Sequence, residues 1–295
     1  MNHTLALPLF AILLASQLTS CIPENCESCN KTIKDSTLLC VSFSGDYTLT
    51  KSVSAIPAGV QTSIFAYSSG SNPKIQSSYP GTPLEAISDV NGNLSICSGN
   101  RLFVPPGTYD FYAISTNEPT ISGLTIKNGV SNSLDNCVDY LWAASKERSV
   151  EQNTNVILQF AHRVATICLT ITPEDLANDL AIKSMKVRLP LSGSSMNIST
   201  GIISAARVLD TAMTQMSLKE NTGTCLMLPL ISGTDLPVEI CIDAIIYRAS
   251  IPAPAKGFEG GFRYKYIASV GLSGITFLNA SLEEWKEQIL TTINL

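Results

Sequence analysis

The sequence has little charge and almost no histidine. Asp, Glu, Lys and Arg make up 15% of its 295 residues, whereas an average globular domain has about 25%. Of the two histidines, only His162 lies beyond the first residues, and it falls inside an apolar run. That setting favours a structural strand residue over a catalytic-triad member or metal ligand. The net charge of −5 comes without a basic stripe, which argues against a nucleic-acid partner.

Motifs that carry enzyme chemistry are also missing. There is no G-x-S-x-G elbow and no glycine-rich phosphate loop. Residues 28–31 match S-x-x-K by letters, but the companion elements are absent. A segment beginning at Asp89 resembles the start of a calcium loop, yet its sixth residue is Leu94 and its twelfth is Asn100, so an Asn-Gly hairpin turn is the better interpretation. The sequence therefore predicts no enzyme, no cofactor and no metal site.

A single apolar stretch, Leu5 to Leu14, is broken only by Pro8. It is too short to span a bilayer and precedes small residues, as in a secretory signal peptide, which we place at residues 1–20. Leu-Thr-Ser-Cys21 resembles the bacterial lipobox. This predicts lipidation of Cys21 with acyl chains such as palmitate, and two or three chains anchor a protein stably. The segment before the apolar run lacks Lys and Arg, which departs from the usual signal. The alternative is a secreted protein in which Cys21 has no such role.

Nine cysteines fit export, because eight remain once Cys21 is lipidated and an oxidising compartment permits disulfides. Cys168 and Cys241 fall on the polar faces of two predicted strands. They could form a disulfide if these strands are neighbours, and otherwise they are half-buried thiols. Cys26 and Cys29 lie in a predicted tether, residues 21–36, where a local disulfide or two thiols are expected rather than a redox or zinc motif.

Alternation of apolar and polar residues dominates the rest of the chain and predicts an all-β protein with antiparallel strands buried on one face. Clear examples are residues 39–43, 109–113, 165–171, 238–244 and 262–270. Helix signals are few: one turn from Pro173, and a capping-box pattern at Ser281–Glu284 before Trp285. The polar stretch from Lys146 to Asn155 divides the chain into two predicted β-sandwich domains, 37–150 and 151–295.

Several segments, in order along the chain, resemble the fimbrillin-like lipoproteins of the Bacteroidales. RLFVPPGTYDFYAIS, residues 101–115, resembles a Pro-Pro-Gly strand of that family, and DYLWA, residues 139–143, resembles a segment that follows the strands of its first domain. Residues 156–171 resemble a strand that contains His162. The Tyr264, Tyr266 and Trp285 region resembles its closing strands.

The resemblance implies two tandem transthyretin-like β-sandwich domains in a subunit of type V pili. Such subunits reach the outer membrane as lipoproteins, and a protease then cuts after an arginine to remove the first strand, here residues 38–43. The open edge accepts a donor strand from another subunit, which satisfies its backbone groups and fills its pockets. Residues 288–295, QILTTINL, suit a donor because alternate residues are apolar or Thr; they suit a last strand of their own domain equally well.

The chain departs from this pattern at the cleavage site. The first arginine after Cys21 is Arg101, which lies beyond the first strand. We therefore expect cleavage at Lys51 or none at all. An uncleaved subunit would keep its lipid and act as an anchor or minor subunit.

Asp35-Ser36-Thr37 and Asp210-Thr211-Ala212 resemble the O-glycosylation site of these bacteria, which makes Ser36 and Thr211 candidates. The expected function is thus that of a surface-exposed outer-membrane lipoprotein and fimbrial subunit in cell adhesion. Its expected partners are other pilus subunits through strand exchange, the membrane through lipid, and surface glycans or proteins. A monomeric glycan-binding surface lipoprotein is the alternative, although both tryptophans, Trp142 and Trp285, match structural positions of the family.

Overall fold

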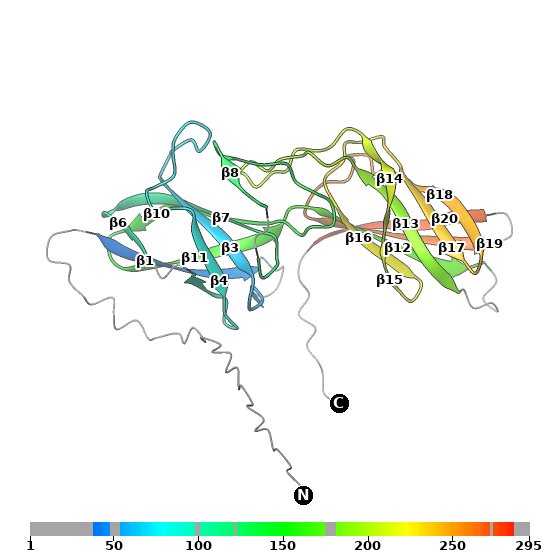
Figure 1. Ribbon diagram of the computed structural model, residues 1–295, viewed down its shortest axis with the longest axis horizontal. Coiled ribbons are helices and arrows are strands. Elements are labelled where there is room, and N and C mark those ends of the chain that lie inside the picture. Colours follow the sequence, from blue (N-terminus) through cyan, green and yellow to red (C-terminus); the bar gives the residue numbers. More distant parts are fainter. Residues whose placement is uncertain are drawn as a thin grey trace, which may run out of the picture. The chain divides into compact units, whose positions relative to one another are not determined.

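The computed structural model describes residues 38–47, 54–97, 101–120, 123–174, 181–271 and 274–285, and every regular element in them is a strand (Figure 1). This part of the chain holds no helix that is long and apolar enough to cross a membrane. The described residues beyond Thr37 belong to one compact unit. The expected all-β class is confirmed.

The first part of the chain forms one sheet that closes on itself like a barrel. Its strands follow the order β11-β10-β7-β3-β4-β5-β1, and β1 also pairs with β11. Two short strands, β2 and β6, add to β1. The bounds are β1 Leu39–Tyr47, β2 Ser54–Ala55, β3 Gln61–Ser68, β4 Leu84–Ser88, β5 Asn93–Ile96, β6 Leu102–Val104, β7 Gly107–Ser115, β10 Leu141–Val150 and β11 Thr154–His162.

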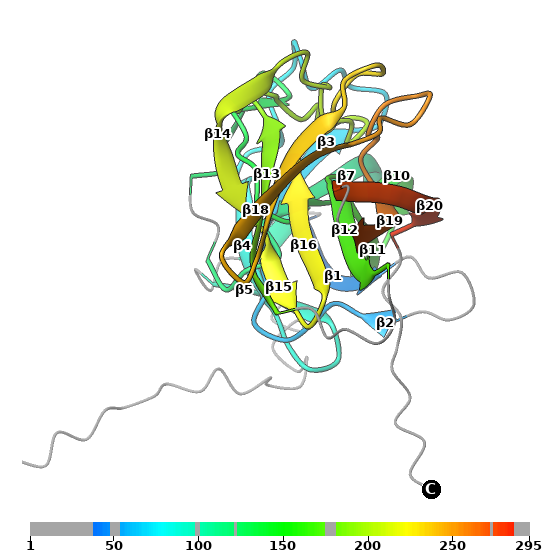
Figure 2. The same cartoon turned by 90° about the vertical axis from the view of Figure 1, so that its right-hand side faces the viewer.

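The second part of the chain forms two sheets with a hydrophobic core between them (Figure 2). One sheet has the order β15-β16-β12-β19-β20, and the other has the order β14-β13-β17-β18. Inward-facing residues such as Ile167, Val187 and Tyr266 are buried in this core. The bounds are β12 Ala165–Pro173, β13 Ile182–Pro190, β14 Leu209–Gln215, β15 Ser217–Lys219, β16 Thr222–Met227, β17 Leu236–Ile242, β18 Ile245–Ile251, β19 Phe262–Gly271 and β20 Gly274–Glu284.

A separate aromatic-rich cluster joins the two parts. It contains Tyr67 and Tyr112 from the barrel and Met196, Ile198 and Leu228 from the later segments. A small ribbon of β8 (Ile126–Lys127) and β9 (Val130–Ser131) lies in the connecting region, where Val130 forms an isolated bridge with Asn197. The barrel and the later sheets therefore share buried surface.

Two sequence-based expectations are corrected or confirmed by the strand assignments. The predicted helical start at Ser281–Glu284 is wrong, because these residues continue β20 and pair with β19, with Arg263 opposite Glu283. This ladder overrides a local capping pattern, since tertiary pairing outweighs weak propensity. The Asn-Gly turn is confirmed: it joins β4 to β5, and the Asp89 carboxylate accepts hydrogen bonds from the backbone of Asn91 and Asn93.

The predicted domain boundary at residue 150 separates one strand, β11, from the strands with which it pairs. Strand β11 follows residue 150 in the sequence, yet it pairs with β1 and β10 and so completes the first sheet. The two tandem transthyretin-like domains, 37–150 and 151–295, remain a prediction. The sheet closes into a barrel because β1 pairs with β11 on one edge and with β5 and β6 on the other.

Candidate strand-exchange site

Strand β1 is the element that closes the barrel. On one edge it pairs in parallel with β11, from Val41 opposite Thr154 to Tyr47 opposite Phe160. On the other edge it pairs antiparallel with β6 and then with β5. Its alternate residues Val41, Phe43 and Tyr47 are buried in the barrel core. Without β1, two strand edges and a row of apolar pockets would be exposed.

The position between Phe43 and Tyr47 accepts no side chain. A Cβ atom placed on Gly45 would lie 2.9 Å from Ile56 and 2.9 Å from the ring of Phe160. The Gly45 backbone is fixed as well, because its N–H donates to the Gly92 carbonyl at 2.8 Å and its carbonyl accepts from Ile56 N–H at 3.0 Å. Any strand that takes the place of β1 must therefore offer a glycine here or displace these neighbours.

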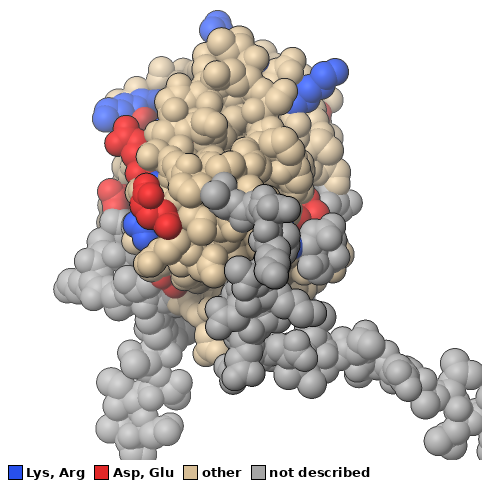
Figure 3. Space-filling model, turned by 90° about the vertical axis from the view of Figure 1, so that its left-hand side faces the viewer, with Lys and Arg blue, Asp and Glu red and all other residues tan. Residues whose placement is uncertain are grey.

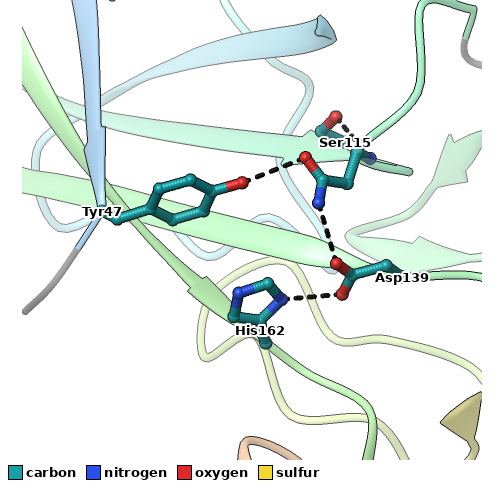
Figure 4. Close-up of polar contacts among 5 residues, drawn as sticks. Tyr47, Ser115, Asp139 and His162 are labelled. Atoms are coloured by element: carbon teal, nitrogen blue, oxygen red, sulfur yellow. Dashed lines mark hydrogen bonds and ion pairs between the residues drawn. The ribbon is translucent and has the colours of Figure 1, made fainter. Parts of the chain in front are cut away.

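A chain of polar contacts begins at the end of β1 (Figure 4). The Tyr47 hydroxyl donates to Asn117 Oδ1 at 3.0 Å, and Asn117 Nδ2 donates to Asp139 Oδ2 at 2.9 Å. The other carboxylate oxygen of Asp139 lies 2.8 Å from Nδ1 of His162. The side chain of His162 is 2% exposed. Such a buried network is strong when each member has its partners, and it fixes the ring orientation of His162.

The same histidine stacks on two aromatic rings. Its imidazole lies nearly parallel to the Trp285 ring with centroids 3.8 Å apart, and nearly parallel to the Tyr47 ring at 5.6 Å. The backbone N–H of Trp285 donates to the Gly261 carbonyl at 2.8 Å. Trp285 directly follows β20, and two residues separate it in the sequence from the candidate donor segment, 288–295. His162 thus connects the end of β1 to Trp285, the residue that follows β20.

Removing the Asp139 carboxylate tests this network. Asp139→Ala is expected to reduce the free energy of unfolding by about 1–3 kcal/mol, because buried partners on His162 and Asn117 lose an acceptor. Asp139→Asn should lose less, since the amide oxygen still accepts one bond. Chemical denaturation measures both. Asp135→Ala is the control, because Asp135 is exposed, and a loss as large there would contradict the assignment.

The structure separates the two cysteines proposed as a disulfide. Cys168 lies in β12 of the five-stranded sheet and Cys241 lies in β17 of the four-stranded sheet, and both are free thiols. The strands are not neighbours, so the condition for that disulfide is not met. Burial raises the pKa of the Cys168 thiol, although a hydrogen bond from Thr224 opposes this shift. Cys168 is therefore a poor nucleophile at neutral pH.

Of the other candidate site residues, the structure describes Thr211. Thr211 is exposed in β14, where an O-linked glycan would have space. Cys21, Ser36, Lys51 and residues 288–295 lie outside the described residues and remain predictions. His162 lies on a strand, as the sequence predicted, whereas the roles of Tyr47 and Asn117 were not predicted. Their partners are distant in sequence, so no local pattern reveals them.

Comparison with models of protein families identifies the family of this chain. A family model described as fimbrillin-like matches residues 50–285. The chain belongs to the fimbrillin-like family. This family consists of fimbrial subunits rather than enzymes, and membership in it agrees with the expectation that the chain has a structural role. The family suggested by the sequence motifs is confirmed.

Several solved structures share the fold of this chain. A "putative cell adhesion protein" from Bacteroides uniformis matches this fimbrillin-like chain with a TM-score of 0.64 and 15% identity, covering 85% of this chain and 100% of that one. One of the same description from Bacteroides ovatus gives 0.62 and 15%, with 85% and 99% covered. The tip fimbrial protein Mfa3 from Porphyromonas gingivalis gives 0.53 and 9%, with 84% and 100% covered. A search of curated proteins finds no match.

Proposed function

We propose that this fimbrillin-like chain is a pilus subunit and an outer-membrane surface lipoprotein, anchored through Cys21 and joined to other subunits by strand exchange at the site of β1. The observation that carries the proposal is the dual pairing of β1, which closes the barrel and fills its core with alternate side chains. A strand in that position is replaceable by another strand with the same alternation. Residues 288–295 supply such an alternation but contain no glycine, so Ile56 and Phe160 would have to shift to admit a side chain where Gly45 lies.

The burial of β1 explains why removal must precede exchange. Its three core side chains, Val41, Phe43 and Tyr47, contribute about 1.5–3 kcal/mol each through the apolar surface they bury. A donor strand from another subunit would have to displace this intramolecular contact at an entropic disadvantage. An uncut subunit therefore keeps β1 and its lipid, and it can end a fibre as an anchor or minor subunit but cannot extend it.

The strand order identifies which cut would open the site. Lys51 lies in the sequence between the end of β1 at Tyr47 and the start of β2 at Ser54. Cleavage there would release β1 alone. Arg101 lies between β5 and β6, so cleavage after Arg101 would also detach β2, β3, β4 and β5 and destroy the sheet. Lys51 is therefore the candidate processing site for a polymerising form of this chain.

The descriptions of solved structures with this fold support the proposal. Two are described as cell adhesion proteins, and one is described as a tip fimbrial protein. The face viewed in Figure 3 carries few charged side chains, and residues of other kinds occupy the middle of its described part. Adhesion partners of this chain would then be other pilus subunits and, at a surface, glycans or proteins.

The test is a blot of surface material sheared from cells, run with and without boiling. We expect a ladder that heat collapses to one band, because strand-exchanged subunits resist detergent until heated. Lys51→Ala and deletion of residues 288–295 should each abolish the ladder while the monomer persists. A single monomer band in the membrane fraction of wild-type cells would contradict polymerisation, and a ladder that survives both changes would contradict the assigned strands.

A further inference from the structure

The outer face of the five-stranded sheet carries a groove that strand exchange does not use. The groove has a volume of about 830 Å³, and its lining residues come mainly from β12, β15, β16, β19 and β20. These strands are labelled in Figure 2. That volume lies within the range of small-ligand sites, which are about 300–1,000 Å³. The barrel and β1 supply none of its lining residues. Its chemistry can therefore be considered apart from assembly.

Hydroxyl groups line much of this groove. Neighbouring strands β12 and β16 place Thr170 and Thr222 side by side, with their hydroxyl oxygens 2.9 Å apart. Thr224 donates to the sulfur of Cys168 at 3.9 Å. Further polar side chains come from Asn279 and Ser281 on β20. Each hydroxyl can donate and accept, and so can the amide, which matches the paired donor and acceptor character of sugar hydroxyls.

One of these hydroxyls has no partner inside the protein. Thr166 lines the groove and is 3% exposed, and its Oγ1 makes no hydrogen bond within the described part of the chain. A buried hydroxyl without a partner costs free energy unless a ligand or water satisfies it. The opposite face of β12 is ordinary core, since Ile167 and Leu169 are fully buried there. The unpartnered Thr166 hydroxyl thus favours a polar ligand in the groove, because such a ligand would supply the missing hydrogen bond.

The charge of the groove is opposite to that of the whole chain. Its lining includes Lys219, Arg263 and Lys265 and no carboxylate, although the chain carries a net charge of −5. Lys265 pairs with Glu283 at 2.8 Å. The Arg263 guanidinium lies 5.9 Å from the Trp285 ring centroid. A guanidinium binds a carboxylate through two parallel hydrogen bonds, and the indole beside it offers an apolar surface.

We propose that this groove binds an acidic saccharide, with Arg263 on its carboxylate and the threonine hydroxyls on its sugar hydroxyls. Because Lys265 is already paired with Glu283, Lys219 and Arg263 are the cations that favour an anion. The row of hydroxyl groups favours a polyol over an acidic peptide, whose backbone would need a free strand edge instead. The groove gives the pilus subunit a ligand of its own. The inference goes beyond the proposed assembly function and does not depend on it.

Calorimetry on the full chain, purified in detergent, tests the proposal with two acidic probes. These are tetragalacturonate and 3′-sialyllactose. We expect measurable binding of at least one acidic probe. We also expect its affinity to fall as salt is raised, because the charges of the groove are partly screened. For tetragalacturonate, the fully methyl-esterified tetramer is the neutral match, and lactose serves for sialyllactose. Each neutral form should bind at least tenfold more weakly.

Variants of the groove sharpen the test. Arg263→Gln should weaken the acidic probe by about tenfold or more, because the bidentate contact is lost. Thr222→Val keeps the shape of the side chain and removes one hydroxyl, so a smaller loss is expected. Arg207→Gln is the matched control, since Arg207 is exposed and lies outside the groove. Thermal melting confirms that each variant is folded.

Three results would overturn the proposal: neither acidic probe binds, the neutral forms bind equally well, or Arg263→Gln leaves the affinity unchanged in a folded protein. The sheared-surface blot is read independently. A heat-sensitive ladder without saccharide binding would remove only the saccharide site. Saccharide binding without a ladder would remove only the pilus assignment.

Discussion

Phe43→Ala is expected to reduce the free energy of unfolding by about 3–5 kcal/mol, the usual cost of deleting a buried aromatic ring. Phe43 is 2% exposed in the centre of β1 and meets Phe111 edge to face at 5.5 Å. The same change should raise sensitivity to proteases, because a weakened β1 leaves the barrel more often and exposes two strand edges. Urea denaturation and limited proteolysis measure the two effects.

The matched control for that experiment is Phe103→Ala. Phe103 lies in β6, directly beside β1, but it is 40% exposed. Its loss should cost well under half as much, since less apolar surface leaves water on folding. Equal losses at the two positions would mean that β1 does not hold the barrel core together, and the strand-exchange site would have to be sought elsewhere.

Gly257→Ala is the second large effect, with an expected loss of about 3–5 kcal/mol when left-handed backbone strain is added to overpacking. Gly257 has a φ of 81°. A Cβ atom there would lie 2.3 Å from the Leu230 carbonyl oxygen. That carbonyl accepts a hydrogen bond from Phe258 at 2.9 Å, and Leu230 N–H donates back at 2.9 Å. The added methyl group would separate this pair and loosen the core of the second part of the chain.

Gly233→Ala isolates the backbone contribution. Gly233 has nearly the same φ, 79°, but a Cβ atom there meets nothing within 4 Å. Its loss should be about 1 kcal/mol, which is the strain alone. Thermal denaturation of both variants gives the difference. If the two glycines prove equally sensitive, the close approach at Leu230 is not a fixed feature of the fold.

The strands themselves were predictable because their signal is local. Alternation placed β1, β7, β12, β17 and β19 within a few residues, and the apolar set faces the core in each. The Asn-Gly turn before β5 also follows from local chemistry. The helical turn at Ser281 failed for the opposite reason: pairing with β19 is a tertiary contact that a capping pattern does not contain.

The site could be predicted only in outline. The family motifs indicated that the first strand matters, and His162 was expected on a strand. Nothing local showed that the Tyr47 hydroxyl would reach Asn117, or that His162 would stack on Trp285. The groove was also not predictable, because its threonines and cations come from four separate strands. Such a site depends on strand order, which alternation does not determine.

The closure of the barrel also sets an order of events for the new chain. Ser42 and Asn155, which are hydrogen-bonded across the β1–β11 contact, are 113 positions apart. During synthesis and export, β1 is thus the first strand to emerge and must wait for its partner, while the loop-closure entropy is paid last. A sheet that is still open between β1 and β11 is therefore a stage that every new chain passes through. If cleavage occurs after folding, the removal of β1 opens the same β11 edge again, and an incoming strand closes the sheet where β1 had closed it.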